Sequence, residues 1–213
     1  QLRRAGGGGR RPRVTASRRA AEVCRAAAAL RDGEAVVYPT ETVYGLGADA
    51  TDHDAVTAVF DLKRRERAKP LSVGFPSVAA ATRDTRPTAR EERFMRSFLP
   101  GPVTAVVDRG PDIPDVLTAG RERVGVRVPA NPIALSLLAA VGRPVTATSA
   151  NRSGAASVRR VADLDTAVRD GVTIVVDGGE TPGGGSTVVD PGTGEVHREG
   201  PLGDAVRAWL ARN

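Results

Sequence analysis

The body of this chain alternates short apolar runs with segments of helical spacing, and this alternation restricts its fold more than any other feature. Apolar runs of strand length occur at 35–38, 71–73, 103–107, 124–128, 145–148, 172–176 and 186–189. Apolar residues recur with helical spacing at 17–30, 52–65, 88–99, 131–141, 161–169 and 202–211. Strands that alternate with helices along a chain are typical of the α/β class. The sequence therefore predicts an α/β fold.

The sheet of this fold is expected to be mixed, with helices flanking it. Residues 188–196 surround a Pro191-Gly192 turn and predict two adjacent antiparallel strands. Strands joined through helices usually pair in parallel instead, so the two patterns together indicate a mixed sheet. Neither an internal repeat nor a linker interrupts residues 14–213, which predicts one domain over that range.

Few residues in the chain could build a metal centre or a disulfide. Cys24 is the only cysteine, which excludes an internal disulfide and a cysteine-cluster zinc site. His53 and His197 are the only histidines, so no protein-built metal site is expected. No stretch has the roughly 20 apolar residues of a membrane-spanning helix, and the first residues do not resemble a secretory signal. The sequence therefore predicts a cytoplasmic protein without a membrane partner.

Positive charge is concentrated at the start of the chain. The formal net charge is +6, and residues 1–19 hold seven arginines and no acidic residue. Subtracting these seven from +6 leaves −1 for residues 20–213. We expect residues 1–13, which are rich in Arg and Gly, to form a flexible tail. A tail without a binding role is favoured over an RNA-binding arm.

Lysine is rare in this chain. Only Lys63 and Lys69 are lysines among 31 basic residues, and both lie in the segment 63–71 with three arginines. Five neighbouring cations repel one another unless an anion neutralises them, and a compact ammonium group suits a phosphate. A chance clustering of lysines, or cations placed at a helix C-terminus, is the structural alternative. The functional hypothesis is a polyphosphate ligand.

Three further loops concentrate small hydroxyl residues and glycines. They are 38–47, 146–154 and 183–187, and the first two follow apolar strands. Ligands of α/β proteins commonly bind at strand ends, although each loop alone is also typical of an ordinary turn. No Ser-His-Asp arrangement or carboxylate cluster occurs in these loops. The residues favour phosphoryl or nucleotidyl transfer by positioning and charge neutralisation, without naming a substrate.

Ordered motifs over about residues 15–212 resemble the YrdC-like family, the L-threonylcarbamoyladenylate synthases. They are Y-P-T-E-T-V-Y-G-L-G (38–47), the K-x-R of Lys63 and Arg65, K-P-L (69–71), L-P-G-P-V-T (99–104), T-A-G (118–120), V-R-V-P (126–129), the S-x-N of Ser149 and Asn151, D-G-G (177–179), S-T-V-V-D (186–190) and Arg198. Because the chain ends at Asn213, it is expected to resemble the short, single-domain form.

The resemblance implies a fold and a reaction. The fold would be an open, twisted mixed sheet with flanking helices and a basic concave ligand face. The reaction would condense L-threonine, bicarbonate and ATP into threonylcarbamoyl-AMP and pyrophosphate, with Mg²⁺ carried by ATP. A tRNA threonylcarbamoyltransferase would then use the product to form N6-threonylcarbamoyladenosine in tRNA. The chain would thus be a nucleotidyltransferase of tRNA modification.

The resemblance also implies roles for particular residues. Lys63 and Arg65 would grip the triphosphate and act in catalysis. The other ATP-binding residues would be Lys69, Thr118, Ser149, Asn151, Ser157 and Arg198. The threonine-binding residues would be Thr40, Arg127 and Ser186. Where relatives often carry a histidine after the K-P-L strand, this chain has Gly74, so its role would pass to the backbone or to Arg127.

Two alternatives remain. One is a carbamoyl-adenylate-handling domain of the hydrogenase maturation type, which shares the fold but normally belongs to longer chains with zinc segments. The other is a module that binds tRNA or double-stranded RNA weakly. The charge of −1 over residues 20–213 disfavours the second, because binding by counterion release needs many dispersed cations.

Overall fold

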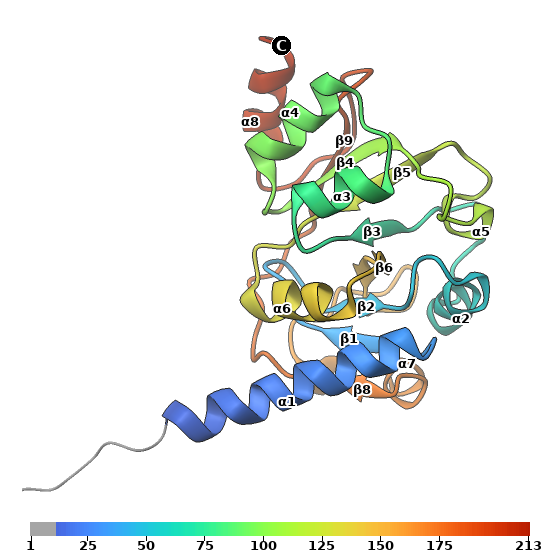
Figure 1. The fold of residues 1–213 in the computed structure, drawn as a ribbon, viewed down its shortest axis with the longest axis vertical. Coiled ribbons are helices and arrows are strands. Elements are labelled where there is room, and N and C mark those ends of the chain that lie inside the picture. Colours follow the sequence, from blue (N-terminus) through green and yellow to red (C-terminus); the bar gives the residue numbers. More distant parts are fainter. Residues whose placement is uncertain (1–11) are drawn as a thin grey trace, which may run out of the picture.

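The computed structural model describes residues 12–213, with the side chains described from residue 17 (Figure 1). The helices are α1 (Pro12–Arg31), α2 (His53–Lys63), α3 (Val78–Asp84), α4 (Ala89–Phe98), α5 (Asp115–Thr118), α6 (Pro132–Val141), α7 (Thr166–Asp170) and α8 (Gly203–Leu210), with a 3₁₀ turn at Val161–Asp163. The strands are β1 (Val36–Tyr38), β2 (Gly45–Gly47), β3 (Ser72–Gly74), β4 (Val103–Asp108), β5 (Arg123–Arg127), β6 (Val145–Thr146), β7 (Thr148–Ser149), β8 (Ile174–Val175), β9 (Thr187–Asp190) and β10 (Glu195–Arg198).

The strands form two mixed sheets. The smaller sheet has the order β7-β2-β1-β8, and the larger has the order β10-β9-β4-β5-β3-β6. In the larger sheet β4 pairs parallel with β9 and antiparallel with β5, while β3 pairs parallel with β5. The α/β class and the mixed, open arrangement predicted from the sequence are confirmed. The hairpin predicted around Pro191-Gly192 is present as β9 and β10.

The apolar run predicted as one strand over 145–148 is divided between the two sheets. Val145 and Thr146 pair with β3 in the larger sheet, whereas Thr148 and Ser149 pair with β2 in the smaller. Between them, the backbone N–H of Ala147 donates to the carbonyl of Ser72 over 2.7 Å. The chain therefore passes from one sheet to the other at Ala147.

Side-chain caps explain where the longer helices begin. The carboxylate of Asp52 accepts hydrogen bonds from the backbone N–H groups of Asp54 and Ala55, so α2 begins at His53. Thr88 and Glu91 form a reciprocal capping box at the start of α4. Asn131 caps α6, with Pro132 in its first turn. These three helices follow the sequence prediction closely.

The helices cover both sheets and enclose two apolar cores. Figure 1 shows α3 and α4 in front of the larger sheet and α1 running beside the smaller one. The larger core joins the larger sheet to α2, α4 and α8, where the Phe94 and Trp209 rings meet edge to face. A second core lies between α1, β1 and α6 and includes the fully buried Leu30 and Leu137.

Some elements differ from the sequence prediction. Two short helices, α3 and α5, were not predicted, and the helix expected over 161–169 is a 3₁₀ turn followed by α7. α1 begins at Pro12, earlier than the expected 17. The tail predicted for residues 1–13 falls mainly on residues 1–11, which lie outside those described. Within residues 12–213, no helix is long and apolar enough to cross a membrane.

Candidate active site

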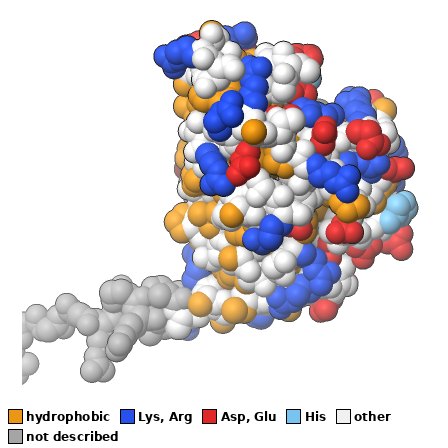
Figure 2. Space-filling model, turned by 45° about the horizontal axis from the view of Figure 1, so that its top comes forward, with side chains coloured by type: hydrophobic (Ala, Val, Ile, Leu, Met, Phe, Trp, Pro, Cys, Tyr) orange, Lys and Arg blue, Asp and Glu red, His pale blue; other side chains and the backbone are white. Residues whose placement is uncertain are grey.

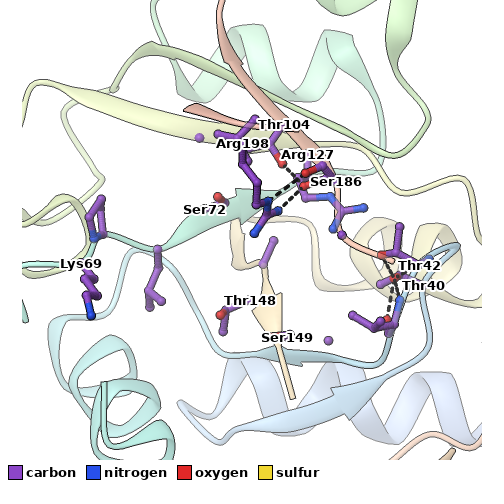
Figure 3. Close-up of a pocket in the computed structure, with 18 of the residues that line it drawn as sticks. Thr40, Thr42, Lys69, Ser72, Thr104, Arg127, Thr148, Ser149, Ser186 and Arg198 are labelled. Carbon is purple, nitrogen blue, oxygen red and sulfur yellow. Dashed lines mark hydrogen bonds between the residues drawn. The ribbon is translucent and has the colours of Figure 1, made fainter. Parts of the chain in front are cut away.

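A cavity of about 570 Å³ lies between the two sheets and is lined by residues of both (Figure 3). Eight of the eleven site residues predicted from the sequence line it. They are Thr40, Arg65, Lys69, Arg127, Ser149, Ser157, Ser186 and Arg198. Lys63, Thr118 and Asn151 do not line it. The fold thus brings together side chains from four loops that are far apart in the sequence.

The cavity wall is strongly cationic. Its charged side chains, among the described residues, are Arg65, Lys69, Arg121, Arg123, Arg127 and Arg198, joined by the titratable His197. Within the described part of the chain, no carboxylate lines the cavity. Lys69, Arg123 and Arg127 each form an ion pair with a carboxylate outside the lining. The excess positive charge of the described wall therefore rests mainly on Arg65, Arg121 and Arg198, and it attracts an anionic ligand. The cavity is therefore suited to a polyanion.

Lys63 is buried behind the cavity rather than exposed in it. The residue is 1% exposed, and its ammonium group donates hydrogen bonds to the carbonyls of Ser149 and of Asn151, the latter over 2.6 Å. Burial, together with the smaller effect of the nearby positive charge of Arg65, lowers the pKa of Lys63 to about 8. Lys63 does not line the cavity in this geometry, and its direct contact with a triphosphate stays a prediction. Lys63 instead holds the loop that carries Ser149.

Arg65 and Lys69 lie on the loop between α2 and β3. Arg65 donates from Nε to the carbonyl of Lys69 and from Nη2 to the carbonyl of Pro70, both over 2.9 Å. These two bonds fix the guanidinium against its own loop, and burial lowers the pKa of Arg65. Lys69 forms an exposed ion pair with Glu66 and lies at one margin of the view in Figure 3. Both cations remain part of the cavity wall.

The other two residues outside the cavity shape the loops beside it. Thr118 is fully buried at the end of α5, where its hydroxyl lies 3.5 Å from the carbonyl of Asp115. Asn151 is 9% exposed and donates from Nδ2 to the carbonyls of Arg152 and Ala155. Its Oδ1 atom is buried without a hydrogen-bond partner. Neither side chain lines the cavity, and their contacts with a nucleotide stay predictions.

Ser186 and Arg198 form a connected group at the β9–β10 side of the cavity. Arg198 donates from Nε to the carbonyl of Ser186 and from Nη2 to its hydroxyl, over 2.9 and 2.8 Å. The Ser186 hydroxyl also lies 2.8 Å from that of Thr104 on β4, as the dashed lines of Figure 3 show. Burial lowers the pKa of Arg198, and Arg127 and Arg65 act in the same direction. An anion bound here would relieve this mutual repulsion.

Arg127 lies next to this group, and Thr40 lies beyond it on the same side of the cavity (Figure 3). The Thr40 hydroxyl donates to the carbonyl of Val43 over 2.6 Å and lies 3.0 Å from the Thr42 hydroxyl. Arg127, at the end of β5, forms an ion pair with Glu41, and both side chains are only 13% exposed. Glu41 also accepts from the backbone N–H of Ala130 over 3.1 Å. Arg127 is thus held in place by a carboxylate behind the wall.

The sequence analysis did not identify several cavity residues. They include Ser72, Thr104, Arg121, Arg123 and His197. Ser72, Thr104 and Arg123 lie within strands, where one face of each strand turns toward the cavity; only the pairing of strands reveals that face. Gly74 does not line the cavity, and a Cβ atom there would lie 3.5 Å from that of Ala147. A side chain at this position would therefore contact Ala147 first.

Comparison with known proteins places the chain in a family. The family model described as "Telomere recombination", the Sua5–YciO–YrdC model, matches residues 28–200. The chain belongs to the Sua5–YciO–YrdC family. This confirms the resemblance that the sequence motifs indicated.

Relatives of this Sua5–YciO–YrdC chain carry a consistent name. A threonylcarbamoyl-AMP synthase of Pyrococcus abyssi is 39% identical over 78% of this chain, and one of Enterobacter sp. (strain 638) is 33% identical over 84%. The human threonylcarbamoyl-AMP synthase is 36% identical over 89% of this chain. The chain spans 49% of the Pyrococcus protein, 95% of the Enterobacter protein and 71% of the human protein. It thus spans about half the length of the Pyrococcus relative.

Solved structures share the fold of this Sua5–YciO–YrdC chain. P. abyssi Sua5 complexed with L-threonine is 36% identical, with a TM-score of 0.79, over 87% of this chain and 56% of that one. E. coli YciO is 25% identical, with a TM-score of 0.78, over 85% of this chain and 90% of that one. A full-length HypF structure, 20% identical with a TM-score of 0.70 over 79% of this chain and 27% of that one, shares the fold alone.

Proposed function

We propose that this chain is a threonylcarbamoyl-AMP synthase, which condenses L-threonine, bicarbonate and ATP to threonylcarbamoyl-AMP and pyrophosphate. The observation that carries the proposal is the cavity wall, in which six Arg and Lys side chains and several hydroxyls meet without a carboxylate among the described residues. The names of the relatives and the threonine bound to P. abyssi Sua5 support the same activity.

The proposed chemistry needs positioning and charge neutralisation rather than a covalent enzyme intermediate. The threonine nitrogen bonds to the carbon of bicarbonate, water leaves, and a carbamate forms. A carbamate oxygen then attacks the α-phosphorus of ATP. The bond from that phosphorus to the bridging oxygen breaks, and pyrophosphate leaves with the electron pair. Cations near the phosphorus and the leaving group stabilise the developing charge, each worth a few kcal/mol when well placed.

The threonine portion of the site would be formed by Thr40, Arg127 and Ser186. Arg127 supplies a guanidinium suited to a carboxylate, and the ion pair with Glu41 fixes its orientation. The Thr40 and Ser186 hydroxyls can donate to or accept from the amino acid, since hydroxyls serve in both ways. Holding the carbamate beside the nucleotide in this way supplies part of the rate acceleration.

The phosphate portion would be formed by Arg65 and Lys69, with Lys63 behind it. Arg65 and Lys69 line the cavity and can neutralise the leaving pyrophosphate. Lys63 would position the Ser149 loop through its two hydrogen bonds to backbone carbonyls. Its ammonium group would also add positive charge behind the phosphate portion. Ser149, Ser157 and Arg198 would hold the nucleotide, while Asn151 and Thr118 would shape the loops around it.

The remaining parts of the proposal concern partners. Mg²⁺ would enter with ATP, as part of the substrate. Within residues 12–213, no group of three or more His, Cys, Asp or Glu side chains could hold a metal ion. The product would pass to a tRNA threonylcarbamoyltransferase in the cytoplasm, where tRNA is the final acceptor.

The test is pyrophosphate release by the purified chain with Mg²⁺-ATP, threonine and bicarbonate. We expect release that requires both threonine and bicarbonate, and a threonylcarbamoyl-AMP product detected by mass spectrometry. Arg65→Ala should reduce the rate by at least 100-fold, a loss typical of a removed transition-state donor. Pyrophosphate release that does not depend on threonine, or that requires carbamoyl phosphate instead, would overturn the proposal.

A further inference from the structure

His197 occupies an irregular position on the edge strand of the larger sheet. In the pairing of β10 with β9, Val196 lies opposite Val189 and Arg198 lies opposite Val188, so His197 is the additional residue between them. Such a bulge redirects a side chain and is common beside functional sites. His197 lines the cavity together with its neighbour Arg198. The bulge therefore allows two consecutive side chains to contribute to one wall.

Glu195 defines the orientation of the imidazole. The Nδ1 atom of His197 lies 3.2 Å from Oε1 of Glu195, and the His197 side chain is 39% exposed. A carboxylate at this distance favours a proton on Nδ1, which leaves the lone pair of a neutral ring on Nε2. Nε2 is then a hydrogen-bond acceptor.

An acceptor nitrogen is unusual in this wall. The charged side chains of the described wall are Arg and Lys, which only donate hydrogen bonds, whereas its Ser and Thr hydroxyls can both donate and accept. Phosphate and carboxylate oxygens are acceptors and are served by those donors. His197 instead suits a ligand group that donates an N–H or O–H. In ATP, the groups that donate are the exocyclic amine of adenine and the hydroxyls of ribose.

The position of His197 fits the nucleoside end of ATP. β10 forms one margin of the larger sheet, and β3, which follows Lys69, lies four strand spacings away. At about 4.8 Å per spacing, these strands are about 19 Å apart. If the pyrophosphate portion lies near Arg65 and Lys69, the nucleoside extends toward β10. Val106 and Val188 line the cavity on that side and offer an apolar surface to a planar base.

We propose that His197, oriented by Glu195, is a specificity-determining residue that accepts a hydrogen bond from the nucleoside of ATP. This inference rests on the proposed function, because ATP is taken as the ligand. The donor is either the adenine amine or a ribose hydroxyl, and analogues that lack one or the other distinguish them.

The experiment measures equilibrium binding of ATP, ITP and 2′-deoxy- and 3′-deoxy-ATP by calorimetry in Mg²⁺ buffer, without threonine. ITP lacks the exocyclic amine, and each deoxy analogue lacks one hydroxyl. We expect the wild-type chain to prefer ATP over the analogue that lacks the donor by about 5- to 10-fold, the size of one neutral hydrogen bond. His197→Leu should weaken ATP binding by that factor and abolish the preference. His197→Gln, which keeps an acceptor, should restore part of it.

A matched control and a second variant separate this role from a structural one. His53 lies outside the cavity at the start of α2, so His53→Leu should leave every affinity ratio unchanged. Glu195→Ala should reduce the preference partly, because the ring loses its orienting partner. A loss of folding alone would weaken all four nucleotides equally and leave their ratios intact.

The outcomes distinguish this proposal from the proposed function. Unchanged affinity ratios in His197→Leu, with normal threonine-dependent pyrophosphate release in the wild type, would overturn the His197 assignment alone. If His197→Leu changes the nucleotide affinity ratios but the wild type shows no threonine-dependent pyrophosphate release, His197 is supported as a nucleotide contact and the proposed function is overturned. No ATP binding by the wild-type chain would overturn both.

Discussion

At the scale of single residues, Lys63 differs most from its sequence-based interpretation. Its position in a K-x-R motif favoured direct contact with phosphate, yet its ammonium group donates to two backbone carbonyls beneath the Ser149 loop. Motif recognition identifies which residues matter but not the direction in which a side chain points. That direction depends on the packing of α2 against a loop more than 80 residues later, with sequence separations of 86 and 88. Arg65, two residues away, lines the cavity as expected.

The lowered pKa of Lys63 predicts opposite effects of alkaline pH on activity and stability. As pH rises through about 8, folded Lys63 loses its charge, so kcat/KM for ATP should fall. The unfolded chain keeps that proton up to the ordinary value of 10.5, so the contribution of Lys63 to stability should increase between about pH 8 and 10.5. Pyrophosphate assays and denaturant titrations across this range measure both.

Lys63→Met supplies the reference for this prediction. The wild type should gain unfolding free energy relative to the variant as pH rises, and only in the window between about 8 and 10.5. A difference that is constant across the window, together with a flat activity profile in the wild type, would contradict the role given to Lys63.

At the scale of elements, local signals predicted the helices well and the sheet partners poorly. α2, α4 and α6 begin after Asp52, Thr88 and Asn131, because a cap is formed by residues adjacent in sequence. α3 and α5 are too short for a helical period to be evident. The division of 145–148 between two sheets depends on Ser72, which is distant in sequence. Pairing of that kind has no local signal.

The cap of α2 gives a prediction limited to stability. Asp52→Ala removes the acceptor for two backbone N–H groups and should cost about 1 kcal/mol. For a chain of this size, that is a decrease of about 2–4 °C in Tm. Thermal unfolding followed by circular dichroism measures the shift, and Asp52→Ser, which retains a cap, should recover most of it. An equal loss in both variants would contradict capping as the cause.

Arg123 joins the turn of the β9–β10 hairpin to β4 and α4 through ion pairs, in addition to the backbone pairing of β9 with β4. The Nη2 atom of Arg123 lies 2.7 Å from both the carboxylate of Glu91 and that of Asp190, and Nη1 lies 2.8 Å from Asp108. Asp190 also accepts from the backbone N–H groups of Gly192 and Thr193 in the turn. The hairpin carries Arg198 and His197 into the cavity wall, so this network positions part of the site.

Removal of Asp190 should therefore affect both stability and nucleotide binding. Asp190→Ala leaves two turn N–H groups without their acceptor, and should cost about 1–3 kcal/mol and raise KM for ATP more than KM for threonine. Asp108→Ala is the matched control, because Asp108 is 51% exposed and its ion pair contributes little. Equal effects of the two variants on KM for ATP would argue against the positioning role.

At the scale of the whole molecule, the face shown in Figure 2 carries no dominant basic surface. On the face shown in Figure 2, Lys and Arg side chains are interspersed with Asp and Glu side chains. Residues 20–213 carry a formal charge of −1, so the net charge of +6 comes from the start of the chain. The positive charge relevant to the proposed reaction belongs to the side chains that line the cavity. The net charge of the chain gives no indication of this local cluster.

This distribution predicts weak tRNA binding by the folded body. The chain without residues 1–11 loses four of the seven arginines and carries a formal charge of +2. We expect it to bind tRNA weakly and with little dependence on salt, because its basic residues are nearly balanced by acidic ones. Binding of labelled tRNA at 50 and 200 mM salt measures this, with the full chain as the control. High affinity with a steep salt dependence in the shortened chain would contradict the prediction.

The two sheets are interleaved along the chain, which passes between them after β2, after β6 and after β8. If the chain is divided at any single point within residues 48–186, the strands of at least one sheet are split between the two fragments. A chimera that takes the smaller sheet from one relative and the larger from another would need three internal junctions. One recombination event cannot exchange the two walls of the cavity cleanly, so they are inherited, and must be engineered, as a matched pair.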